Sequence, residues 1–109
     1  MGKLTTHVLN VAAGTPAAGM RVELRCLSEA PSPPPRDLQT DADGRCRDLA
    51  EDAVSSLYRL TFDVATYFGR KGRTSIYPEI AITFTCGSDM HYHLPLLLSD
   101  NSYTTYRGS

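Results

Sequence analysis

The sequence predicts an all-β protein, an antiparallel β-sandwich with Greek-key connections. Two observations support this prediction. Short segments in which polar and apolar residues alternate at period two recur along the chain, and clusters of glycine, proline and aspartate separate them. Only one short segment has the features of a helix. We therefore expect about seven or eight strands and one minor helix, in a single domain that spans residues 1–109.

The first half of the chain contains two clear strand signals. Residues 4–10 are rich in threonine and valine, and Arg21–Cys26 alternates polar and apolar residues, which gives one solvated and one buried face. The glycine- and proline-rich residues 14–19 form the connection between them. The prolines of residues 31–35 predict a stiff surface loop that acts as a spacer. Residues 41–44, Asp-Ala-Asp-Gly, predict a hairpin-type turn whose glycine takes a positive φ.

The middle of the chain contains a strand followed by the one predicted helix. Residues 57–63 alternate as a strand does, and Asp63 can then cap one or two helical turns over residues 64–68. Gly69 is expected to close this helix. The basic residues 70–73 predict a solvated loop.

Three further strands complete the predicted sandwich: Glu79–Cys86, His91–Leu98 and residues 103–107. The first places Ile80, Ile82, Phe84 and Cys86 on one face. Pro95 interrupts the second, and because proline has no N–H to donate to a ladder, we expect it at a sheet edge or a bulge.

Composition excludes several function classes. The net charge is −1 and the isoelectric point is near 6.3, so no basic surface indicates nucleic acid or an anionic membrane as a partner. No apolar run approaches the ~18 residues that span a bilayer. The N-terminal residues lack the apolar stretch of a secretion signal, which predicts a cytoplasmic protein. A peroxisomal location stays open, although the final Arg-Gly-Ser differs from a Ser-Lys-Leu address.

The cysteines predict no redox or metal chemistry. Cys26, Cys46 and Cys86 are odd in number and lack the short paired spacing of zinc sites. We therefore expect three reduced and partly buried thiols.

The three histidines lie in predicted strands. His91 and His93 are two residues apart, so they project from the same face, together with Pro95 and Leu97. The opposite face, formed by Tyr92, Leu94, Leu96 and Leu98, is expected to fill the core. His91 and His93 with His7 form one possible zinc set, but no carboxylate or cysteine has a matching position. A structural or surface role for any single histidine is the alternative interpretation.

The C-terminal residues combine proton-transfer and anion-binding groups where disorder is the usual expectation. Tyr106, Arg107, Gly108 and Ser109 end the chain with a free carboxylate, and Arg45 follows the predicted turn. The chain has no Gly-x-Ser-x-Gly motif and no cysteine beside a histidine, so nothing supports a covalent nucleophile. This pattern favours a histidine that acts on water, with an arginine that stabilises the developing negative charge.

Several motifs resemble those of the 5-hydroxyisourate hydrolases, the transthyretin-related enzymes of urate breakdown. The matching segments are Leu-Thr-Thr-His-Val-Leu at residues 4–9, Gly-Thr-Pro-Ala-Ala-Gly at 14–19, Asp-Gly-Arg-Cys at 43–46, Tyr-Pro-Glu at 77–79, His-Tyr-His-Leu-Pro-Leu-Leu-Leu-Ser at 91–99 and Tyr-Arg-Gly-Ser at 106–109. The last two are the most specific. Two positions depart from the family pattern: Asn10 stands where aspartate is common, and Ser-Asp-Asn-Ser at 99–102 replaces Ser-Pro-aromatic-Gly.

The resemblance implies a transthyretin-like fold, with two four-stranded sheets and a short helix, assembled as a homotetramer that is a dimer of dimers. It implies active sites in the channel between the dimers and hydrolysis of the N1–C6 bond of 5-hydroxyisourate, which gives 2-oxo-4-hydroxy-4-carboxy-5-ureidoimidazoline. The scheme of a histidine that acts on water, with an arginine that stabilises the negative charge, needs no cofactor and no metal.

The resemblance also implies roles for particular residues. The catalytic residues would be His7, Arg45, His93 and Ser109, and the substrate-binding residues would be His7, Arg45, Tyr106, Arg107 and Gly108. Which of His7 and His93 is the general base stays open. His91 is not carried over, and it is either a supporting residue or a surface histidine.

Two alternatives belong to other classes. A small-molecule carrier of the transthyretin type would bind an apolar aromatic ligand, and it would have apolar or non-titrating residues at positions 7, 93 and 106. This chain has two histidines and a tyrosine there. A metal-binding or structural β-sandwich that uses the histidine cluster is the third interpretation.

Overall fold

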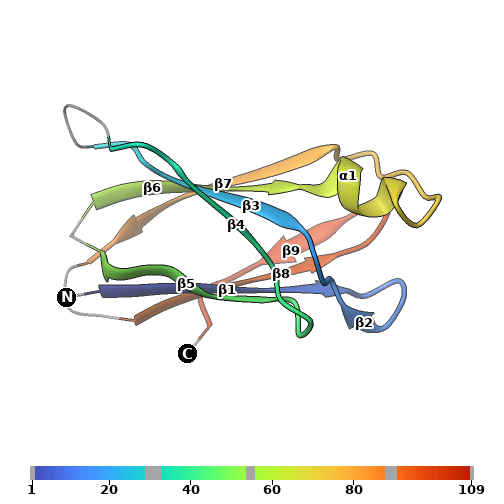
Figure 1. Ribbon diagram of the computed structural model, residues 1–109, viewed down its shortest axis with the longest axis horizontal. Helices are drawn as coiled ribbons and strands as arrows, with labels where there is room; N and C mark the ends of the chain where they lie inside the picture. The colour runs from blue at the N-terminus through green and yellow to red at the C-terminus, as the bar shows by residue number, and fades with distance from the viewer. Residues whose placement is uncertain (1, 29–32, 54–55, 88–90, 109) are drawn as a thin grey trace.

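The computed structural model describes residues 2–28, 33–53, 56–87 and 91–108. Two β-sheets pack face to face, with one short helix at one end (Figure 1). The first sheet contains β1 (Gly2–Asn10), β2 (Thr15–Pro16), β5 (Arg45–Ala53), β8 (His91–Leu98) and β9 (Tyr103–Thr105). The second contains β3 (Arg21–Cys26), β4 (Arg36–Gln39), β6 (Ser56–Asp63) and β7 (Glu79–Cys86), and the helix is α1 (Val64–Gly69). The predicted fold class is confirmed.

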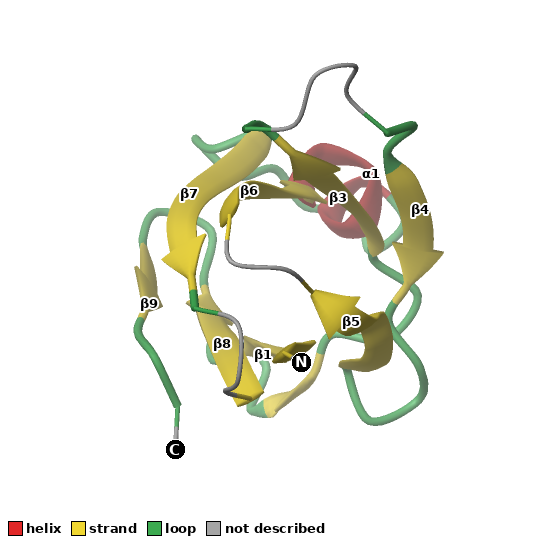
Figure 2. Ribbon diagram, turned by 90° about the vertical axis from the view of Figure 1, so that its left-hand side faces the viewer, coloured by secondary structure: helices red, strands yellow, loops and turns green. Residues whose placement is uncertain are grey.

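Strand β1 organises the first sheet. It pairs with β5 and, further along, with β2, in both cases antiparallel, and its other edge pairs with β8. The β1–β8 pair is parallel, which departs from the antiparallel expectation. The second sheet has the order β4-β3-β6-β7 and is antiparallel throughout its described pairs. Figure 2 shows the two sheets facing each other across the core.

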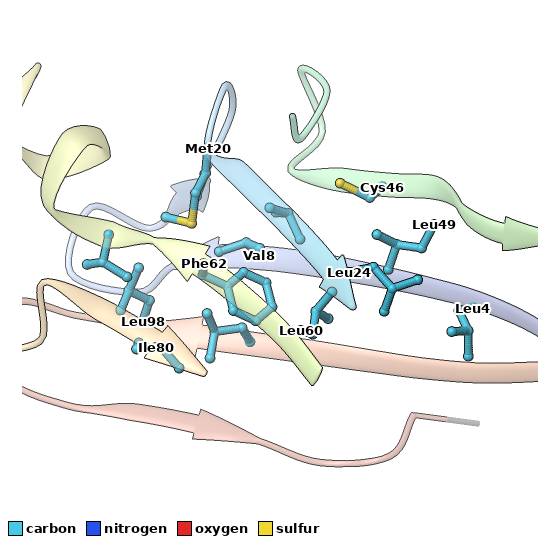
Figure 3. Close-up of a cluster of buried hydrophobic side chains, with 14 of the residues drawn as sticks. Leu4, Val8, Met20, Leu24, Cys46, Leu49, Leu60, Phe62, Ile80 and Leu98 are labelled. Carbon is cyan, nitrogen blue, oxygen red and sulfur yellow. The ribbon is translucent and has the colours of Figure 1, made fainter. Parts of the chain in front are cut away.

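The core lies between the sheets, where alternate residues of each strand meet. Leu4 and Val8 of β1 point inward and face Leu60 and Phe62 of β6 (Figure 3), and each of these is at most 1% exposed. The predicted inward face of β8 is confirmed, because Leu94, Leu96 and Leu98 are buried and Tyr92 packs against the core. Because side chains alternate along a strand, Lys3, Thr5 and His7 lie on the outer face of the same sheet.

The predicted turn and helix start are confirmed. Gly44 has a φ of 76°, and a Cβ at this position would lie 2.4 Å from the carbonyl oxygen of Val8, so only glycine fits there. Asp63 caps α1 by accepting a hydrogen bond from the backbone N–H of Thr66. The expectation for Gly69 is wrong, because it is the last helical residue and the right-handed Arg70 follows as the cap.

Other segments extend or correct the prediction. The structure adds β2, β4 and β5, which were not predicted, and β9 ends at Thr105, two residues earlier than expected. The loop predicted at residues 31–35 lies partly outside the described residues, and its described part, residues 33–35, is exposed. The three cysteines are buried and none forms a disulfide. Among the described residues, α1 is the helix present, and it is too short to cross a membrane.

Pro95 lies in an interior strand, between β1 and β9, and its pairing with β1 continues without a register shift, so the expectation of an edge or a bulge is wrong. His93 and Gly108 form an antiparallel bridge, and Leu97 pairs with Thr104 in the same register. Alternate residues of β8 therefore direct their N–H groups toward β9, and Pro95 occupies one of these positions. The regular pairs between β8 and β9 begin only at Leu96, so no hydrogen bond of this ladder needs an N–H from Pro95. This explains why β8 tolerates a proline.

The two departures from the family pattern leave the fold intact. Asn10 is 2% exposed, and its amide group donates to the hydroxyl group of Tyr67 and accepts from the backbone N–H of Ala13. At the end of β8, the backbone N–H of Ser99 donates to the carbonyl oxygen of Ser102 over 2.9 Å, and the two hydroxyl groups lie 2.8 Å apart. This turn returns the chain into β9, so the last strand pairs with β8 despite the changed sequence.

Candidate active site

An open hollow of about 400 Å³ lies on the outer face of the first sheet, where β1, β5 and β8 run side by side. We call this surface the histidine face, and it consists of the lining residues Lys3, Thr5, Thr6, Arg45, Arg47, His91 and His93. Five of the seven side chains are titratable or cationic, and the other two are threonines. The hollow is therefore polar and positively charged when the histidines are neutral.

The strand register brings distant parts of the sequence to this face. In the parallel β1–β8 ladder, Lys3 pairs with His91 and Thr5 pairs with His93. In the antiparallel β1–β5 ladder, His7 pairs with Arg45. Paired residues project from the same side of a sheet, so the first and last long strands of the chain supply the histidine face together.

The hydroxyl group of Thr5 contacts both histidines of β8. Its oxygen lies 2.7 Å from Nδ1 of His93 and 2.9 Å from Nε2 of His91. The two imidazole rings lie 6.3 Å apart, on either side of this hydroxyl group. Nδ1 of His93 is thus occupied by Thr5, which leaves Nε2 as the ring nitrogen for a bound molecule.

The electrostatic environment favours the neutral form of His93. Partial burial lowers the pKa of His93 below its ordinary value, and the positive charges of Arg45, His91 and His7 lower this pKa further. A neutral imidazole can accept a proton, whereas an imidazolium cannot. The surroundings of His93 therefore suit a general base near neutral pH.

His7 is held differently. Its Nε2 lies 2.9 Å from the carbonyl oxygen of Asp43, in the turn that precedes β5. A carbonyl oxygen only accepts hydrogen bonds, so Nε2 of His7 carries the proton in this contact. Asp41 fixes the turn, because its Oδ1 accepts from the backbone N–H groups of Asp43 and Arg45, each over 2.9 Å. His7 thus lies next to the histidine face, and its hydrogen bond to Asp43 connects β1 with the turn before β5.

The two arginines of β5 have different surroundings. Arg47 pairs with Asp41 at 3.1 Å and approaches Asp43 at 3.8 Å. Arg45 lines the hollow and makes no ion pair within the part of the chain that the structure describes. Its guanidinium group is therefore available to a carbonyl oxygen or an anion, which is the role that the sequence analysis expected of it.

The C-terminal residues divide between two sides of β8. The backbone N–H of Gly108 donates to the carbonyl oxygen of His93 over 2.7 Å, so this glycine lies against the predicted base. Arg107 instead lies with its guanidinium carbon 4.1 Å from the centre of the Tyr92 ring, a residue of the inward-facing set. Tyr106 is 54% exposed and does not line the hollow, and Ser109 lies outside the described residues.

Four residues that line the hollow were not predicted as site residues: Lys3, Thr5, Thr6 and Arg47. Period-two alternation places Lys3 and Thr5 on the side of His7, but only the strand pairing shows that this side also carries His91 and His93. The zinc interpretation gains no support from the geometry. Among the described residues, no group of three or more histidine, cysteine or acidic side chains is arranged to hold a metal ion.

Comparison with known proteins identifies the family of this chain. A model of the HIUase/Transthyretin family matches residues 4–108. The 5-hydroxyisourate hydrolase of Mus musculus is 43% identical over 97% of this chain and 94% of the relative, and the probable 5-hydroxyisourate hydrolase of Schizosaccharomyces pombe is 40% identical over 97% and 90%.

Solved structures give the same result for the fold. The structure of Klebsiella pneumoniae 5-hydroxyisourate hydrolase superposes with a TM-score of 0.87 at 35% identity, covering 100% of this chain and 94% of the other. Transthyretin from Sparus aurata superposes with a TM-score of 0.88 at 28% identity, covering 97% and 96%. With the family match and the full-length relatives together, this chain belongs to the HIUase/Transthyretin family.

Proposed function

We propose that this chain is a 5-hydroxyisourate hydrolase. One observation carries the proposal: His93 and Arg45 line the same polar hollow, where burial and the nearby positive charges lower the pKa of His93. The names of the relatives from mouse and fission yeast agree with it. The transthyretins have the same fold, so the residues of the site must distinguish the two functions. A hollow lined by histidine, arginine and lysine favours a polar substrate over an apolar carried ligand.

His93 is the proposed general base. It would take a proton from water at Nε2 while the water oxygen attacks C6 of the substrate, a contribution of about 10²–10⁴-fold to the rate. The proton would then pass to N1 as the N1–C6 bond breaks, which leaves a carboxylate and gives 2-oxo-4-hydroxy-4-carboxy-5-ureidoimidazoline. His7 is the less suitable base because its Nε2 donates to Asp43. We assign it to binding and to the orientation of the β5 turn.

Arg45 is the proposed stabiliser of the oxyanion that forms at C6. Its planar guanidinium group offers two parallel N–H donors to an oxygen atom in the hollow. Loss of one preorganised donor to an oxyanion typically costs about 2.7–4 kcal/mol in transition-state stabilisation. This scheme uses side chains and water alone, so the proposal includes no cofactor and no metal.

The C-terminal residues complete the proposed site. Gly108 already lies against His93, and Tyr106, Arg107 and Ser109 are proposed to bind or orient the substrate once the site is closed by a neighbouring subunit. The hollow is open in one chain, and a homotetramer that is a dimer of dimers would cover it with a second copy. We further propose that residues 1–109 form one hydrolase domain and that it acts in the cytoplasm.

A coupled assay tests the function. 5-Hydroxyisourate is generated from urate with urate oxidase, and its disappearance is followed with and without the protein. The expected result is faster decay with the protein than without it. His93→Ala and, separately, deletion of residues 106–109 should abolish the acceleration while the tetramer persists in light scattering. Arg25→Gln, on the outer face of the second sheet, is the matched control. Unaccelerated decay with the folded wild-type tetramer would refute the proposal.

A further inference from the structure

Thr5 holds a fixed position between the two histidines of β8. Its residue is 8% exposed and its backbone lies in β1, which is paired on both sides, with β5 and with β8. Threonine is β-branched, so its χ1 rotamer is restricted. The hydroxyl oxygen therefore stays within hydrogen-bond distance of His93 Nδ1, at 2.7 Å, and of His91 Nε2, at 2.9 Å.

The number of hydrogens limits how these contacts are made. A threonine hydroxyl group has one proton to donate and two lone pairs that accept, and a neutral imidazole has one N–H. Thr5 can thus donate to only one of the two rings. If it donates to His91 Nε2 and accepts from His93 Nδ1–H, Nε2 of His93 keeps its lone pair. If it donates to His93 Nδ1, the proton of His93 sits on Nε2, and that atom cannot accept a proton from water.

The direction of one hydroxyl group therefore decides whether His93 can act as a base through Nε2. We propose that Thr5 is a positioning residue of this site, whose hydroxyl group accepts from Nδ1–H of His93, donates to Nε2 of His91, and so holds His93 in the tautomer with an unprotonated Nε2. His91 acts through Thr5 as the acceptor that orients this hydroxyl group. This inference rests on the proposed hydrolase function, and it gives His91 a supporting role.

Two substitutions separate the hydroxyl group from the shape of the side chain. Thr5→Val removes the hydroxyl group and keeps the branched shape, and Thr5→Ser keeps the hydroxyl group. Removal of the group that orients an imidazole typically costs about 10- to 100-fold, as measured for metal-bound histidines. We expect Thr5→Val to lower kcat by about this factor with KM changed less than about twofold. Thr5→Ser should restore most of kcat.

The tautomer itself is the second readout. Nitrogen-15 NMR of the histidine rings, recorded near neutral pH, distinguishes Nδ1–H from Nε2–H. We expect His93 to carry its proton on Nδ1 in the wild type and in Thr5→Ser, and to be a mixture of both tautomers in Thr5→Val. Thr83→Val is the matched control, because Thr83 is an exposed residue of β7 whose hydroxyl group accepts from Arg59. It should change neither readout.

The outcomes distinguish this inference from the proposed function. A wild-type protein without activity would refute the hydrolase proposal, and the NMR readout would then decide the role of Thr5 alone. An active wild type with an unchanged kcat and tautomer in Thr5→Val would overturn the role of Thr5. A folded Thr5→Ser variant that is as slow as Thr5→Val would also overturn it, because the side-chain shape would then be the cause.

Discussion

Gly108 packs directly against the ring of His93. Its backbone N–H donates to the carbonyl oxygen of His93 over 2.7 Å, and a Cβ built on Gly108 would lie 2.8 Å from Cδ2 of the imidazole. Real Cβ contacts are essentially never this short. The C-terminal residues thus fix one side of the proposed base, while Thr5 fixes the other.

The first prediction concerns this contact. Gly108→Ala must displace either the imidazole ring or the C-terminal residues. A displacement of about 1 Å in a site can cost about 10²-fold in rate, so we expect kcat/KM to fall by about that factor. The thermal midpoint of unfolding should change little, because Gly108 lies outside the hydrophobic core. Decay kinetics of 5-hydroxyisourate and a thermal melt check both parts, and wild-type kinetics in Gly108→Ala would contradict the prediction.

The second prediction concerns pH. Burial is the largest cause of the lowered pKa of His93, followed by the charge of Arg45. A general base is active when it is neutral, so kcat/KM should fall as the pH falls through this pKa. We expect the midpoint of the acid limb to lie below 6.5, the ordinary value for histidine.

Arg45→Gln tests the contribution of the charge. It removes one cause of the lowered pKa, so the midpoint should move up toward 6.5 while the maximal rate falls. A profile of kcat/KM between about pH 5 and pH 8 measures both effects. A wild-type midpoint above 6.5, or a downward shift in Arg45→Gln, would show that His93 is not the titrating base.

The third prediction concerns Arg107 and Tyr92. The stacked guanidinium group is worth about 0.5–1 kcal/mol if it resembles other exposed cation–π contacts. We expect Tyr92→Leu to reproduce part of the loss of activity of Arg107→Ala, because both release the C-terminal residues. Tyr92→Phe keeps the ring and should be less affected. A double-mutant cycle should show non-additive effects, whereas fully additive effects would indicate that Arg107 acts without Tyr92.

The fourth prediction concerns the thiols. Burial raises the pKa of Cys46 to about 11, with Asp41 and Asp48 adding to the effect, and burial also raises the pKa of Cys86. Thiolates are the reactive species, so these groups should react slowly with Ellman's reagent at pH values near 8. We expect a small fraction of the three thiols to react in the native protein and all three after denaturation. Rapid reaction of all three in the native protein would be inconsistent with this burial.

The sequence predicted those parts of the fold that depend on local patterns. The alternation of polar and apolar residues at period two predicted the strands Arg21–Cys26 and Glu79–Cys86 with the bounds that the structure has. It failed for β5, whose sequence Arg-Cys-Arg-Asp-Leu-Ala-Glu-Asp-Ala does not alternate regularly, and the structure shows register shifts in its pairing with β1. A strand with such irregularities buries its apolar residues at uneven intervals, so periodicity does not identify it.

For the candidate site, the sequence indicated some of the residues that line the hollow but not how they are arranged. The shared face of His91 and His93 follows from their spacing, and Arg45 follows from the turn before it. The role of Thr5 requires the parallel register with β8, which no local pattern encodes. The position of Arg107 also depends on the register of the C-terminal residues with β8. Neighbouring residues of an extended chain point to opposite sides. The pairing of His93 with Gly108 therefore directs Arg107 to the other face, where it lies over Tyr92.

The parallel pairing of β1 with β8 has a consequence for folding kinetics. Thr5 and His91 are 86 residues apart in sequence, and contacts of such separation raise the relative contact order and slow the search for the native state. The proposed catalytic groups therefore come together only after β1 and β8 have paired. Recovery of turnover during refolding should therefore trail the recovery of secondary structure, so that activity would report complete folding of the chain.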